Sequence, residues 1–136
     1  MPKITPHEAL IYVMITTAAA DRQISDRELD RIAQIIRHLP VFLGYDLDKL
    51  TTAAERCGAV LSSEHGLDEL LDTIAGALPK KLYETAYALA VEVAAADLRV
   101  PEEEVRLLEL FRDALNLDKL VTTAIERGAR ARHQTL

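Results

Sequence analysis

The chain of 136 residues carries one short pattern twice, once towards each end. Residues 18–29 read AAADRQISDREL, and residues 94–105 read AAADLRVPEEEV. In each copy a run of alanines precedes an aspartate, a β-branched residue follows, and the next segment is rich in carboxylates. An internal repeat constrains the architecture before any other feature, because both copies are expected to fold alike. We predict that each copy forms the end of one helix, a turn and the start of a second helix.

Further matches extend this repeat along the chain. The sequence LDKL occurs at residues 47–50 and 117–120, and GA occurs at residues 58–59 and 128–129. The first copy is longer within residues 39–45, LPVFLGY, where Pro and Gly indicate a loop. We expect two copies, over residues 6–59 and 82–129, around a pseudo-two-fold axis. The first helices of the two copies should then lie near each other and bring the two acidic turns towards one region of the surface.

The spacing of apolar residues predicts helices throughout. No segment alternates with period two, as a half-buried strand would. Aromatic residues make up 4% of the chain and tryptophan is absent, which favours helices over strands. The sequence therefore predicts one all-α domain over residues 1–136, a compact bundle of roughly seven helices. We expect these helices at residues 5–21, 25–39, 46–61, 67–78, 85–96, 101–115 and 117–128.

Three expectations concern the second half of the chain. The helix at residues 85–96 is the most apolar, which predicts a central, buried position. Its carboxylate Glu92 is a functional acid, the partner of a basic side chain, or a marker of the helix's exposed edge. In the next helix the residues expected to face inward are Val105, Leu108, Phe111 and Leu115. Residues 130–136 are expected to form a frayed basic tail.

Composition excludes several classes of protein. The formal net charge of −6 disfavours a nucleic-acid binder. No apolar run approaches the roughly 20 residues that cross a bilayer, and the N-terminus lacks the apolar core of a signal peptide. Cys57 is the only cysteine, so no internal disulfide can form. We expect a cytoplasmic domain in which Cys57 is a buried, unreactive thiol.

The doubled pattern resembles the TerB family, named for tellurite resistance, and the resemblance covers residues 6–129. It implies a compact helical bundle in bacteria, with a non-enzymatic role in tellurite or metal-stress systems. A similar domain is fused to DnaJ-type co-chaperones. The family's acidic motif, which is suspected of binding cations, corresponds here to Asp21, Glu28, Asp97 and Glu104. Relatives often carry Gly after each motif aspartate, whereas this chain has Arg22 and Leu98.

Two hypotheses account for these acidic residues. They could bind a divalent cation, calcium or magnesium rather than zinc because carboxylate oxygens suit hard ions, with Asp26, Glu102 and Glu103 as weaker members. Alternatively they are structural, with Asp21 in an Asx-type turn and Glu28 and Glu104 in capping boxes. An EF-hand loop is excluded, because Ala and other residues without carboxylates occupy the positions where its oxygen ligands should precede each aspartate.

No motif in the sequence indicates catalysis. There is no nucleophile elbow, phosphate-binding glycine loop or CxxC pair, and the four histidines lack metal-ligand spacing. We therefore expect a non-enzymatic binding domain with no cofactor other than such a cation. A protein partner could instead bind the loop at residues 41–45 through Phe42 and Tyr45, because this loop carries more apolar bulk than a free loop normally exposes. The same loop could equally fold back onto the core.

Overall fold

The computed structural model describes residues 3–20, 24–96 and 102–136. Its helices are α1 (Pro6–Ala18), α2 (Asp26–His38), α3 (Leu50–Leu61), α4 (Gly66–Ala77), α5 (Tyr83–Ala95), α6 (Glu102–Ala114) and α7 (Lys119–Arg132). Short 3-10 turns, η1 (Pro40–Phe42), η2 (Leu47–Lys49) and η3 (Lys80–Leu82), lie between them. The described part of the chain contains no β-strand, which confirms the all-α prediction.

The first two helices begin as their sequences predict. Thr5 accepts a hydrogen bond from the backbone N–H of Glu8, whose carboxylate accepts one from the backbone of Thr5. Ser25 and Glu28 repeat this arrangement at the start of α2. Such capping boxes satisfy two backbone donors that the first turn of a helix leaves without partners. Local sequence alone therefore sets where α1 and α2 start.

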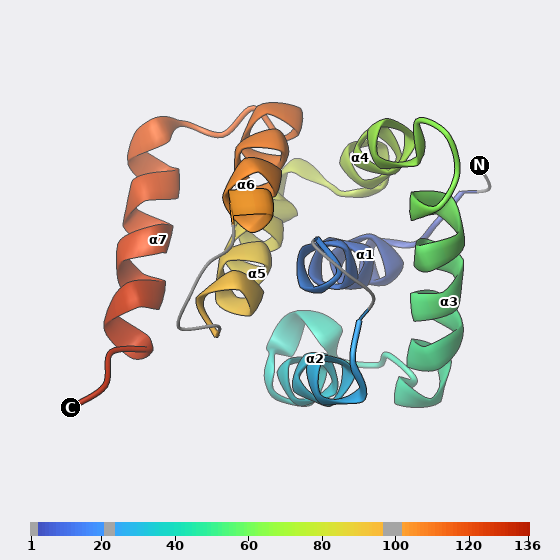
Figure 1. The fold of residues 1–136 in the computed structure, drawn as a ribbon, viewed down its shortest axis with the longest axis horizontal. Coiled ribbons are helices and arrows are strands. Elements are labelled where there is room, and N and C mark those ends of the chain that lie inside the picture. Colours follow the sequence, from blue (N-terminus) through green and yellow to red (C-terminus); the bar gives the residue numbers. More distant parts are fainter. Residues whose placement is uncertain (1–2, 21–23, 97–101) are drawn as a thin grey trace.

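Helix α1 is the centre of the bundle (Figure 1). Every residue from Ala9 to Ala18 is buried, and α1 packs against α2, α3, α4, α5 and α6. Its two buried threonines have partners: Thr17 Oγ1 donates to the carbonyl of Val13 at 2.8 Å, and Thr16 Oγ1 lies 3.6 Å from Cys57 Sγ. We expected the helix at residues 85–96 to be central. Helix α5 is also largely buried but leaves Glu84 exposed, so α1 is the more completely enclosed helix.

Helices α1 and α5 pack together more extensively than any other pair. This agrees with the expected proximity of the first helix of each repeat. The pseudo-two-fold axis itself stays a prediction. In the described residues, no helix has both the length and the apolar character needed to cross a membrane.

Helix α6 is rotated relative to the prediction. Its inward residues are Glu104, Leu107, Phe111 and Leu115, whereas Val105 is 45% exposed. Phe111 and Leu115 were placed correctly, but the carboxylate Glu104, 3% exposed, takes the inward position expected for Val105. The predicted stripe begins at Val105 and the observed stripe at Glu104, and both continue through Phe111 and Leu115. The apolar pattern alone is therefore compatible with either rotation of the helix.

The C-terminal segment differs from the expected frayed tail. Helix α7 continues to Arg132, and Ala129 is buried against the core. The side chains of Arg132 and His133 both bind the carboxylate of Glu92 on α5. Arg132 and His133 therefore hold the end of α7 in place because a carboxylate lies opposite them, whereas residues 134–136 lie outside the helix and are exposed, as expected of a tail.

Candidate functional site

The acidic residues predicted to bind a cation lie in different environments. Asp21 and Asp97 lie outside the described residues. Asp26, Glu102 and Glu103 are exposed, Glu28 is half-buried and Glu104 is buried. Within the ranges that the structure describes, no three or more His, Cys, Asp or Glu side chains are grouped so as to hold a metal ion.

Glu28 has a structural role at the start of α2. Its Oε1 accepts hydrogen bonds from the backbone N–H and the hydroxyl of Ser25, both at 3.0 Å. The Ser25 hydroxyl accepts in turn from the backbone N–H of Glu28 at 3.1 Å. This is the capping box that the second hypothesis for the acidic residues requires.

The helix ends that flank the two acidic turns lie in one region. Ala19 and Ala20, just after α1, line the same cleft of about 380 Å³ as Glu103 and Arg106 of α6. Helices α1 and α6 are also in direct contact. The residues before the first acidic turn and those after the second are therefore neighbours.

The loop at residues 41–45 folds back onto the core. Phe42 is only 3% exposed and its ring stacks on that of His7, with centroids 5.9 Å apart. His7 Nε2 donates a hydrogen bond to the carbonyl of Val41 at 2.9 Å, since a carbonyl can only accept. Tyr45 is half-buried and packs edge-on against His7, whereas Leu43 is 87% exposed. The loop was expected either to bind a partner through Phe42 and Tyr45 or to fold back onto the core. In the structure it folds back, and Phe42 is internal.

Glu92 is the partner of basic side chains. Arg132 Nη2 donates to its Oε2 at 2.7 Å, and His133 Nε2 donates to its Oε1 at 3.1 Å. Burial by itself would raise the pKa of Glu92, but the hydrogen bonds from Arg132 and His133 outweigh it, and the net effect is a lowered pKa. Glu92 is therefore ionised at neutral pH and holds the end of α7 on α5.

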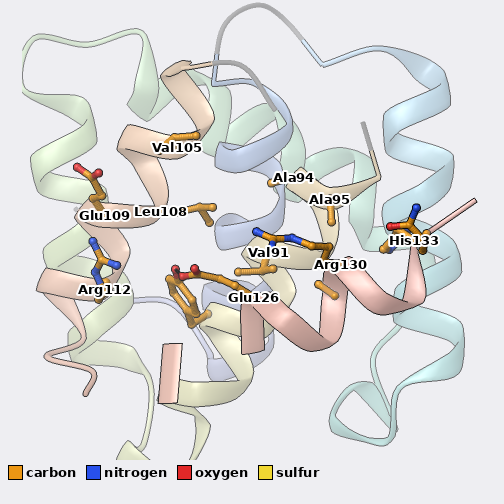
Figure 2. Close-up of a pocket in the computed structure, with 13 residues that line it drawn as sticks. Val91, Ala94, Ala95, Val105, Leu108, Glu109, Arg112, Glu126, Arg130 and His133 are labelled. Carbon is orange, nitrogen blue, oxygen red and sulfur yellow. Dashed lines mark hydrogen bonds between the residues drawn. The ribbon is translucent and has the colours of Figure 1, made fainter. Parts of the chain in front are cut away.

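A cleft between α5, α6 and α7 is the feature that sequence reasoning missed. Its volume is about 450 Å³, and Figure 2 shows Leu108 of α6 and Arg130 of α7 extending towards the space between these helices. At its wall Tyr87 donates a hydrogen bond to Glu126 Oε2 at 2.6 Å. Burial and the adjacent Glu126 carboxylate raise the pKa of Tyr87, so its hydroxyl keeps its proton. The sequence offered no signal for this cleft, because Val105 and Leu108, which line it, both fit the predicted inward stripe of α6.

The chain was compared with known proteins. A family model described as tellurite resistance protein TerB matches residues 7–127. A search of curated proteins and a search of solved structures found no match. The family match spans most of the 136 residues, and TerB proteins have an all-α fold, as this chain does. The chain therefore belongs to the TerB family.

Proposed function

We propose that this TerB domain is a non-enzymatic binding domain of the tellurite or metal-stress response, which holds a divalent cation between its two acidic turns. The observation that carries this proposal is the shared cleft of Ala19, Ala20 and Glu103. The end of α1 lies beside the start of α6, which supports the inference that the two acidic turns share one ion. Calcium or magnesium fits such an oxygen-rich site better than zinc does.

The experiment is a thermal melt of chelator-treated protein with and without calcium, magnesium, manganese or zinc. A cation that binds only the native state raises its stability, by about 2.7 kcal/mol at a concentration one hundred times Kd. We expect a saturable rise that disappears in the double variant Asp21→Asn with Asp97→Asn. The matched control is Asp72→Asn with Asp113→Asn, because both aspartates are exposed and lie elsewhere on the domain. Absence of a rise with every ion would contradict the proposal.

A single substitution separates the two roles open to Glu28. In Glu28→Gln the amide oxygen can still accept from the backbone N–H of Ser25, so the capping box is retained while the charge is lost. If Glu28 binds the cation, this variant keeps its stability in chelator within about 0.5 kcal/mol and loses much of the cation-dependent rise. An unchanged rise would show that Glu28 is a helix cap only.

The second candidate function is a protein-interaction domain whose acidic residues are purely structural. The capping box of Ser25 and Glu28 favours it, because that geometry accounts for Glu28 without any ligand. Melts that respond to no ion would favour this function over the first.

A further inference from the structure

Residues 40–45, between α2 and η2, form a segment whose backbone is hydrogen-bonded to itself. The backbone N–H groups of Phe42, Leu43 and Tyr45 all donate to carbonyls within residues 39–42. In the described chain, no backbone hydrogen bond joins this segment to another helix. A segment attached in this way can open locally at a lower free energy than unfolding of the whole bundle requires.

One side chain of α1 makes three contacts with this segment. His7 Nε2 donates to the carbonyl of Val41 at 2.9 Å, and this is the one hydrogen bond from residues 40–45 to another helix among the described residues. The His7 ring also stacks on Phe42 and meets Tyr45 edge-on, with ring centroids 5.9 and 5.6 Å apart. Because all three contacts belong to a single imidazole, its loss would release them together.

The segment has open space on both of its sides. A cleft of about 490 Å³ lies towards α1 and α3, and a second cleft of about 360 Å³ lies towards the end of α2. Gly44 and Tyr45 line both clefts, so the segment is the partition between them. Phe42 is the one buried side chain of residues 40–45, whereas Leu43 is 87% exposed.

The closed position leaves one polar group unsatisfied. The hydroxyl oxygen of Tyr45 is enclosed and has no hydrogen-bond partner among the described residues. An enclosed hydroxyl without a partner destabilises the state that encloses it, whereas water can satisfy the same hydroxyl once it is exposed. Gly44, the neighbouring residue, has a φ of +88°, a conformation that glycine adopts without strain. The segment therefore has both a hinge residue and a reason to open.

We propose that residues 40–45 are a hinged flap, which His7 latches closed and which opens while the helices stay folded. Opening exposes the rings of Phe42 and His7 and merges the two clefts. The flap thus controls access to this end of the bundle, between α1, α2 and α3. It does not include the acidic turns, and its opening holds whether or not they bind an ion.

The experiment is cleavage of the full 136-residue chain by chymotrypsin over a series of urea concentrations. Chelator is present throughout, so the result does not depend on the proposed cation site. The flap contains Phe42, Leu43 and Tyr45, after which chymotrypsin cuts, and mass spectrometry of the fragments counts only the cuts within it. The cleavage rate follows the population of the open flap when opening is fast. We expect it to depend only weakly on urea below the unfolding transition, because local opening exposes little surface.

Two variants of His7 and one of another histidine supply the matched comparison. His7→Ala removes all three contacts and should speed flap cleavage about fivefold or more. His7→Gln loses the ring, but its amide nitrogen can still donate to the Val41 carbonyl, so we expect an intermediate rate. His38→Ala removes an imidazole that donates to the Gln34 carbonyl of its own helix at 2.7 Å, and should change the rate by less than about twofold.

Fluorine NMR follows the flap and the core separately in the same sample. The chain has two phenylalanines, Phe42 in the flap and Phe111 in the core, so 4-fluorophenylalanine supplies one reporter at each place. In His7→Ala we expect the Phe42 signal to shift or broaden and the Phe111 signal to stay as in the wild type. A change at both positions would show that the whole bundle loosens, which contradicts a flap that opens by itself.

Two cleavage results would also overturn the proposal. Cleavage within residues 40–45 that depends on urea as steeply as global unfolding does would show that this segment opens only with the whole bundle. Equal cleavage rates in His7→Ala and His38→Ala would show that His7 is not the latch.

Discussion

The thiol of Cys57 is enclosed between α3 and α1. Its Sγ lies 3.6 Å from Thr16 Oγ1 and 3.9 Å from the carbonyl oxygen of Tyr12, and the residue has no exposed surface. Burial raises its pKa from 9.0 to about 11, although the hydrogen bond with Thr16 acts in the other direction. Because the thiolate is the reactive form, this environment makes Cys57 unreactive at neutral pH, as its position on an apolar stripe predicts.

The first prediction concerns labelling of Cys57 by a thiol reagent at pH 8. The raised pKa lowers the thiolate fraction about a hundredfold relative to an unperturbed thiol. Lack of exposure slows the reaction further. We expect native protein to react only as fast as it opens, and denatured protein to react at once. Rapid, complete labelling of the native protein, followed by absorbance, would contradict this placement of Cys57.

At the scale of elements, the attachment of α7 combines apolar and polar contacts. Within α7 only Thr122 and Ala129 are buried. The remaining attachment includes the hydrogen bond between Tyr87 and Glu126 and the pairing of Glu92 with Arg132 and His133. Both polar contacts begin on α5. One carboxylate of α5 therefore adds to the burial of Ala129 in positioning the C-terminal part of α7.

The second prediction is that Glu92→Gln loosens the C-terminal turns of α7. We expect faster amide hydrogen exchange there and a loss of up to about 1 kcal/mol of stability at pH 7, because a partly exposed ion pair contributes little more. Glu84→Gln is the matched control, since Glu84 is an exposed carboxylate on the same helix and forms no ion pair among the described residues. Equal exchange rates in the two variants would exclude the proposed role of Glu92.

The same pair has a defined pH dependence. The folded-state pKa of Glu92 lies below the ordinary value of a glutamate, because Arg132 and His133 stabilise the carboxylate, so its contribution to stability is fully present at neutral pH. It is lost as pH falls through the lowered pKa, because the protonated carboxyl no longer attracts Arg132. The difference in denaturation midpoint between wild type and Glu92→Gln should therefore shrink towards zero in acid. A difference in midpoint that grows as pH falls would contradict a lowered pKa of Glu92 in the folded state.

Helix α6 shows why a correct helix can still be wrongly oriented. The pattern that predicts it contains Val105 and Glu104 side by side, and either can begin a stripe that continues through Phe111 and Leu115. Hydrophobicity favours Val105 inside, yet Glu104 is 3% exposed and Val105 is 45% exposed. Neighbouring helices determine the rotation, because α6 must match the surfaces of α5 and α4 at once.

At the scale of the whole molecule, one helix connects most of the others. Helix α1 packs against α2, α3, α4, α5 and α6, and every one of its residues from Ala9 onward is buried. Side chains on all sides of α1 therefore contribute to the same core. Loss of packing on this helix should weaken the entire bundle rather than one edge of it.

The third prediction compares two leucine truncations. Leu10 on α1 has no exposed surface, whereas Leu120 on α7 is 77% exposed. We expect Leu10→Ala to lower the free energy of unfolding by about 2–5 kcal/mol through lost burial and a cavity. Leu120→Ala should stay within about 0.5 kcal/mol of wild type. Chemical denaturation measures both, and comparable losses in the two variants would contradict the central position of α1.

The helices, the two capping boxes and the family of this chain could all be predicted from its amino-acid sequence. Those features depend on residues close in sequence: a cap at Thr5 or Ser25 needs only the glutamate three positions later. Three further features follow from the packing of the helices: Phe42 is internal, Glu104 faces inward, and Arg132 and His133 bind Glu92. This packing also created the cleft between α6 and α7. Such outcomes depend on contacts between residues far apart in the chain, whose net free energy is set by the packing of all helices together.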